Sequence, residues 1–168
     1  MSINNKTKKV VITGIIVITL FEIYFAYKIV MNYAGVYQVG IFIPLILQPL
    51  FYMWLFRIER PYLKIRITII LAISIFLPLV IYFTLPNYTY NKGKEIVKQN
   101  LAQSENYLFT DLTYASDTIP VINNPKQLFV SNRVYYYEVT LKDEKKYFII
   151  NPLTGELKEL ARSYWGSN

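Results

Sequence analysis

The chain has 168 residues, enough for about one ordinary domain, and its formal net charge is +7. Hydrophobic residues make up 54% of it and its mean hydropathy is +0.26, values that are typical of a membrane protein. It has no cysteine and no histidine, which excludes disulfides, thiolate or histidine metal sites and serine–histidine catalysis. We therefore expect a protein that is not an enzyme and that needs no cofactor or metal.

The positive charge is concentrated beside apolar stretches. Lys6, Lys8 and Lys9 precede the first stretch, and residues 57–66 contain four basic residues and one acidic residue. Residues 87–168, by contrast, contain ten basic and nine acidic residues. This distribution is typical of topology signals in membrane proteins and not of a nucleic-acid-binding face. We expect the lipid bilayer as one partner and no nucleic acid as another.

Three apolar stretches, residues 10–30, 39–56 and 67–85, follow an N-terminal segment of residues 1–9. Each is close to the ~20 residues that an α-helix needs to cross a bilayer, so we predict three transmembrane helices within a membrane domain at 10–86. The positive-inside rule places the N-terminus in the cytoplasm and the C-terminus outside it. The abundance of Ile, Asn, Lys and Tyr indicates an AT-rich bacterial gene, and hence a bacterial plasma membrane.

A cleaved signal peptide is the alternative for the first 34 residues. A basic start followed by an apolar run fits it, but the stretch has no small-residue cleavage site and stays apolar beyond the usual length. We therefore expect the first helix to be retained.

The first apolar stretch contains an acidic residue, Glu22. A charged group inside a membrane costs at least ~2.5 kcal/mol, so such a residue is by default a functional hypothesis. Lys28 is a poor partner for it, because six residues correspond to roughly 240° around a helix. Gln48 of the second stretch could instead reach it across a bundle. The alternative is a carboxyl near the outer interface that is protonated or hydrogen-bonded to a tyrosine.

The composition changes at residue 87, where charges of both signs replace the apolar runs. The clearest pattern is the alternation of Tyr135 and Tyr137 with Tyr136, which predicts a strand in a half-buried sheet. We predict a small α+β extracytoplasmic domain over 87–168, an antiparallel sheet covered by one helix. The expected elements are a helix at 91–104, a strand at 107–115, a loop at 116–127, a strand within 128–141, a turn at 142–145, a strand at 146–151, a turn at 151–156, an edge strand at 156–160 and a tail at 161–168.

The stretch from Lys94 to Leu160 resembles a PepSY or PepSY-like (YpmB-like) domain. The resemblance lies in the helix and in VYYYEVTLKDEKKYFIINPLTGEL, a hairpin followed by a Pro-x-Thr-Gly turn at Pro152, Thr154 and Gly155. Asn151 stands where the family usually has Asp. The resemblance implies an extracytoplasmic module that inhibits or modulates peptidases or other envelope proteins, with a structural turn and no catalytic residues.

These observations favour a membrane-anchored regulator or accessory factor that displays its outer module to another membrane or envelope protein, a peptidase being one candidate. Tyrosine offers a large contact area at little entropic cost, so we predict a partner surface at four tyrosines. The alternative is that they only cover the sheet. The four are Tyr135, Tyr136, Tyr137 and Tyr147.

Two further hypotheses remain. In one, the protein is a small transporter or an immunity-type membrane protein, and the helices with Glu22 and Gln48 carry its function. In the other, it is an enzyme that uses the carboxylates of Asp111, Asp117 and Glu138. A solvated surface explains those three carboxylates better, because they lack a defined spacing.

Overall fold

The computed structural model describes residues 5–57, 62–101, 107–122, 128–142 and 144–166. Parts of four predicted elements lie outside the described residues, together with the two ends of the chain. These elements are the basic loop at 57–66, the helix at 91–104, the loop at 116–127 and the turn at 142–145. The chain divides into two compact units, one formed by residues 1–28 and 39–83 and the other by residues 29–38 and 84–168.

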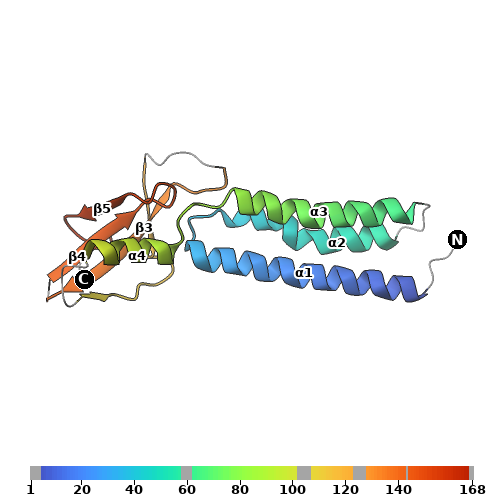
Figure 1. Ribbon diagram of the computed structural model, residues 1–168, viewed down its shortest axis with the longest axis horizontal. Coiled ribbons are helices and arrows are strands. Elements are labelled where there is room, and N and C mark those ends of the chain that lie inside the picture. The colour runs from blue at the N-terminus through green and yellow to red at the C-terminus, as the bar shows by residue number, and fades with distance from the viewer. Residues whose placement is uncertain (1–4, 58–61, 102–106, 123–127, 143, 167–168) are drawn as a thin grey trace. The chain divides into compact units, whose positions relative to one another are not determined.

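The first unit consists of helices (Figure 1). Two of them contain apolar segments, or windows, that are long enough to cross a membrane: Lys9–Tyr33 and Lys64–Phe83. The apolar segment between these two, Val39–Trp54, is shorter. Ile15, Tyr52 and Ile70 pack together between the helices. The elements are α1 (Asn5–Tyr33, whose last residues belong to the second unit), the 3₁₀ helix η1 (Val39–Phe42), α2 (Ile43–Arg57) and α3 (Leu63–Phe83).

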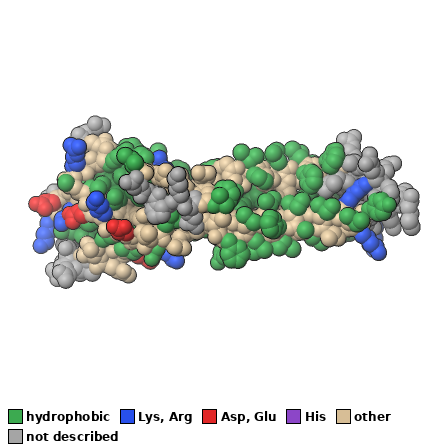
Figure 2. Space-filling model, turned by 90° about the horizontal axis from the view of Figure 1, so that it is seen from above, with side chains coloured by type: hydrophobic (Ala, Val, Ile, Leu, Met, Phe, Trp, Pro, Cys, Tyr) green, Lys and Arg blue, Asp and Glu red, His purple; other side chains and the backbone are tan. Residues whose placement is uncertain are grey.

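The outward-facing surface of these helices is apolar. Only 11% of the residues in each of the two long apolar windows are buried. Figure 2 shows hydrophobic side chains spread over the helical part of the chain, while Asp and Glu side chains appear on the sheet unit. The most exposed examples include Val17, Leu20, Phe21, Ile46, Leu50, Ile75 and Phe76.

The second unit combines one helix with an antiparallel sheet (Figure 1). The strand order is β1-β3-β4-β5, and β2 also pairs with β3. The nine-residue β3 is long enough to hold β1 beside Val139–Leu141 and β2 beside Arg133–Tyr135. The elements are α4 (Tyr90–Leu101), β1 (Tyr107–Phe109), β2 (Thr118–Pro120), β3 (Arg133–Leu141), β4 (Glu144–Ile150) and β5 (Leu157–Leu160).

Two details of this sheet correct the sequence prediction. The predicted strand at 107–115 ends at Phe109, and the predicted loop at 116–127 contains β2. The chain leaves the edge of β3 after Thr110, whose N–H donates to the Glu138 carbonyl, and returns at Asp117, whose carbonyl accepts from Tyr136 N–H. Periodicity does not reveal such an excursion, because the strands on either side of it are only three residues long.

One helix covers one face of the sheet, as predicted, and the opposite face of β3 is covered as well. α4 covers one face, where its Tyr90 ring stacks on Tyr137 and meets Tyr135 edge-on. On the opposite face Tyr136 lies in a cluster built around Ile119 and Val134, with partly buried apolar neighbours. Those neighbours are Leu112, Val121, Tyr147, Ile149 and Leu160.

Residues 29–38, expected within the membrane domain, fold with the sheet unit. Tyr37 forms an antiparallel bridge with Val130, and the N–H and hydroxyl of Ser131 both donate to the Val36 carbonyl, at 2.8 and 2.6 Å. Gly35, with φ of +77°, turns the chain just after α1. Val36 and Tyr37 are buried, so this short connection contributes to the core of the second unit.

Candidate functional site

Three of the four tyrosines predicted as a partner surface lie in the interior. Tyr135 and Tyr136 are 0% exposed and Tyr137 is 1% exposed. The Tyr135 hydroxyl donates to the Tyr88 carbonyl at 2.9 Å, and the Tyr137 hydroxyl donates to the Tyr90 carbonyl at 2.7 Å. Burial raises the pKa of both phenols, which keeps them neutral. This corrects the predicted contact surface: the three side chains are core residues with satisfied polar ends.

The Pro-x-Thr-Gly turn anchors the segment that leads into α4. The N–H of Tyr88 donates to the Pro152 carbonyl at 3.0 Å, and Asn87 Nδ2 donates to the Leu153 carbonyl at 2.9 Å. Gly155 has φ of +74° and lies under the Tyr88 ring, where a Cβ atom would collide with it. The turn therefore has a structural role in the sheet unit.

Thr154 and Asn151 shape the turn itself. Thr154 Oγ1 accepts from the N–H of Glu156, and Asn151 Oδ1 accepts from the N–H of Leu153 at 2.9 Å. Asn and Asp side chains can both make this local bond, so Asn151 suits the turn as well as an Asp would.

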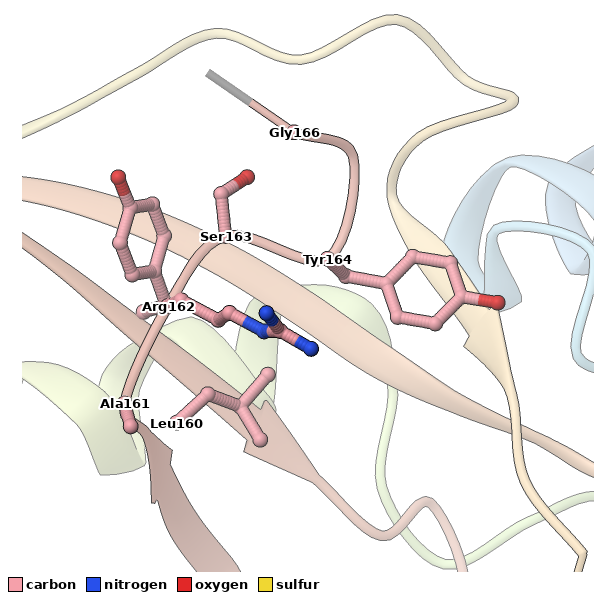
Figure 3. A pocket seen from close by; sticks show the side chains of 7 residues that line it. Leu160, Ala161, Arg162, Ser163, Tyr164 and Gly166 are labelled. Atoms are coloured by element: carbon pink, nitrogen blue, oxygen red, sulfur yellow. The ribbon is translucent and has the colours of Figure 1, made fainter.

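Tyr147 is the member of the predicted surface that stays partly exposed. It lines an open pocket with the end of β5 and the segment that follows, where Arg162 and Tyr164 are exposed (Figure 3). The pocket adjoins β5, which within the described sheet pairs only with β4 and so keeps a free edge. The full lining is Tyr147, Leu160, Ala161, Arg162, Ser163, Tyr164 and Gly166.

Polar contacts hold the C-terminal segment in place beside the pocket. The Tyr136 hydroxyl donates to Glu138 Oε1 at 3.0 Å and lies 3.1 Å from the Ser163 hydroxyl. The Trp165 indole N–H donates to the Ser116 carbonyl at 3.2 Å. Residues 161–166, predicted as a tail, are thus bound to the sheet unit. In the sequence the Tyr164-Trp165 pair leaves two possibilities open, packing on the sheet or dipping toward lipid, and the contact of Trp165 with Ser116 corresponds to the first.

The three carboxylates considered for catalysis do not form one cluster. Asp117 is hydrogen-bonded to Tyr90, and desolvation raises its pKa although Tyr90 and Lys94 act in the opposite direction. Glu138 Oε1 accepts hydrogen bonds from the Tyr136 and Ser163 hydroxyls, and Asp111 is exposed. Among the described residues, no group of three or more acidic side chains is placed to hold a metal ion.

The first unit contains a buried polar cluster that links all three helices. Glu22 of α1 is 1% exposed and Gln48 of α2 is 3% exposed, and Gln48 Nε2 donates to Glu22 Oε1 at 2.5 Å. Gln48 Nε2 also lies 3.5 Å from the Ser74 hydroxyl of α3, which is 2.7 Å from the Tyr52 hydroxyl. The sequence pointed to Glu22 and Gln48 as a pair, but Ser74 and Tyr52 carried no signal.

Comparison of the chain with models of protein families, with curated proteins and with solved structures found no match.

Proposed function

We propose that this is an integral membrane protein of a bacterium that spans the plasma membrane three times and displays its sheet unit outside the cytoplasm. The sheet unit is a PepSY-like module that binds an envelope protein, and the protein acts as a regulator or accessory factor without catalysis of its own. The observation that carries the proposal is the inverted polarity of the helical unit. Two of its polar side chains, Glu22 and Gln48, are buried, and many of its large apolar side chains are exposed.

Lipid is the surrounding that fits such a surface. A water-soluble protein rarely exposes apolar patches beyond a few hundred Å², whereas transmembrane helices require an apolar exterior. The short helix does not oppose this assignment, because η1 and α2 together reach roughly 30 Å at ordinary helical rise, about the thickness of the hydrocarbon core.

The parity of the membrane crossings supports three spans, and the basic residues support the orientation. Residues 29–38 and residues 84–166 fold into one unit, so both segments must be on the same side of the membrane. The chain between them must therefore cross an even number of times. If α3 crosses, then α2 crosses as well. The basic residues in the first turns of α1 (Lys6, Lys8 and Lys9) and those from the end of α2 to the start of α3 (residues 57–66) favour the cytoplasm as the other side.

The pocket beside β5 is the contact surface that we propose for the partner. Its exposed cation, Arg162, and its aromatic side chains, Tyr147 and Tyr164, are residue types that recur at recognition hot spots. A free strand edge beside such a pocket suits an extended segment of another protein, which would add a strand to the sheet.

Labelling of single cysteines tests the topology, because the natural chain has none. Cysteines introduced at Gln38 and Lys145 should react with a membrane-impermeant maleimide in intact cells. Cysteines at Lys9 and Lys64 should react only after permeabilisation. Labelling of positions 38 and 145 on opposite sides would refute the parity argument.

Photo-crosslinking in intact cells tests the binding role. A photoreactive residue at Tyr147 or Tyr164 should capture one discrete protein, and Arg162→Glu should abolish that product. The same probe at the exposed Lys92 of α4 is the matched control and should not give it. Equal capture from position 92, or capture unaffected by Arg162→Glu, would contradict a partner site at this pocket.

A second candidate function, transport or immunity, places the activity in the helices. The buried Glu22–Gln48 contact favours it. Loss of function in Glu22→Gln together with normal function in Arg162→Glu would select it over the binding role.

A further inference from the structure

The polar cluster between α1, α2 and α3 has too few hydrogen-bond donors for its acceptors. Glu22 Oε2 and Gln48 Oε1 are buried and lack a hydrogen-bond partner among the described residues. A buried polar atom left without a partner costs ~1–3 kcal/mol, so two of them in one contact require an explanation.

The neighbouring donors are already used. Gln48 Nε2 donates one hydrogen to Glu22 Oε1 at 2.5 Å and the other to the Ser74 hydroxyl at 3.5 Å. The Ser74 hydroxyl donates to the Ile70 carbonyl at 2.8 Å. The single hydroxyl hydrogen of Tyr52 goes to Ser74 or to the Ile70 carbonyl, at 2.7 and 3.2 Å. The side chains of the cluster thus contain no spare hydrogen.

In the part of the chain that the structure describes, no cation compensates the Glu22 carboxylate either. Among the described residues, α2 contributes Tyr52 as the titratable group beside Glu22, and α3 contributes the hydroxyl of Ser74. On α1 itself the cation of Lys28 lies over the Tyr24 ring. One added proton on Glu22 Oε2 removes this shortage of donors. It turns that oxygen from an acceptor without a partner into a donor, and Gln48 Oε1 can accept its hydrogen bond.

We propose that Glu22 carries a proton and forms a neutral, doubly hydrogen-bonded acid–amide pair with Gln48 between α1 and α2. Gln48 Nε2 donates to Glu22 Oε1, and Glu22 Oε2–H donates to Gln48 Oε1. The site binds a proton and not a metal cation, because only two oxygens of the cluster, Glu22 Oε2 and Gln48 Oε1, lack a hydrogen-bond partner among the described residues, whereas a hard cation requires about six oxygen ligands. Loss of the proton leaves an unpaired anion between the helices and removes one of the two bonds that join them.

Infrared spectroscopy of the full chain in lipid nanodiscs tests the pair, since a protonated carboxyl and a carboxylate absorb at different frequencies. At neutral pH the wild type should show a protonated-carboxyl band that is lost in Glu22→Gln. The band should persist in the matched control Glu144→Gln, which removes an exposed carboxyl of the sheet unit. In Gln48→Leu it should shift to higher frequency, because its C=O loses the amide donor.

Glu22→Gln keeps two paired amides at the site and should fold normally, which circular dichroism checks. A folded Glu22→Gln protein with no band lost relative to the wild type would overturn the proposal. A carboxylate band that shifts when Na⁺ replaces K⁺ would also overturn it, by indicating a bound cation. Failure here leaves the binding role of the sheet unit standing, because that role rests on the other unit and on the crosslinking test.

Discussion

Gly93 of α4 offers a sharp test of how helix and sheet pack in the second unit. A Cβ atom at this position would collide with the hydroxyl of Tyr137 and would lie 3.2 Å from the ring carbon that carries it. The same hydroxyl donates to the Tyr90 carbonyl at 2.7 Å. The close approach of α4 to β3 therefore depends on a glycine in a helix, where glycine is otherwise unfavourable.

The size of the effect of Gly93→Ala follows from three contributions. Helix propensity favours alanine by ~1 kcal/mol. Overpacking against Tyr137 costs ~1–3 kcal/mol, because this side chain is buried between helix and sheet. Displacing its hydroxyl from the Tyr90 carbonyl costs a further ~1–3 kcal/mol. Together these contributions predict a net destabilisation of the second unit by about 1–5 kcal/mol, with a centre near ~3 kcal/mol.

Urea unfolding of the full chain in detergent measures this, with Trp165 fluorescence as the signal in a Trp54→Phe background. Tyr137→Phe is the matched second variant, because it removes the colliding oxygen. In the double variant with Gly93→Ala, the cost of the alanine should fall by ~1 kcal/mol or more, since the two sites are coupled. A neutral or stabilising Gly93→Ala, or a cost unchanged by Tyr137→Phe, would refute the packing described here.

Three other predictions use the same unfolding measurement. Gly155→Ala should destabilise the unit by at least ~1 kcal/mol, because φ is +74° and the new Cβ meets the Tyr88 ring; no change would contradict the turn geometry. Burial raises the pKa of Asp117 above 3.8, so the ionised carboxylate destabilises the folded state and this cost disappears as the pH falls through the folded pKa. Asp117→Asn should therefore raise the free energy of unfolding at pH 7 and make it depend less on pH in the acid range. A pH dependence of stability unchanged by Asp117→Asn would contradict this. Lys146→Ala should cost less than ~1 kcal/mol, because its 3.5 Å contact with Glu159 is solvent-exposed, and a larger loss would show that the pair contributes more than exposed pairs do.

Local patterns accounted for most of the secondary structure. The helices follow the apolar runs, α4 begins after the capping Thr89, whose hydroxyl accepts from Lys92 N–H, and β3 follows the alternation around Tyr136. These features are predictable because the residues that decide them lie within one or two turns of each other. The prediction was weakest at β1 and β2, which exist because β3 offers them an edge.

The burial of Tyr135–Tyr137 shows why the candidate surface was misplaced. Alternation predicts that one face of a strand is exposed, but it contains no information about segments distant in sequence that cover the other face. In this protein Leu112 and Ile119 cover that face, and the C-terminal segment binds the Tyr136 hydroxyl. Exposed tyrosines and buried ones have the same residue pattern, so only the packed structure distinguishes them.

The sequence by itself determined where helices form, where the composition changes from apolar to mixed, and that Glu22 lies in an apolar helix, because these properties depend on neighbouring residues alone. Tertiary structure decided that residues 29–38 join the sheet unit, that Tyr147 alone of the four candidate tyrosines stays partly exposed, and that the Glu22–Gln48 contact is short of one hydrogen. These outcomes depend on contacts between residues far apart in the chain, and no local pattern encodes which distant group completes a core or a hydrogen-bond network.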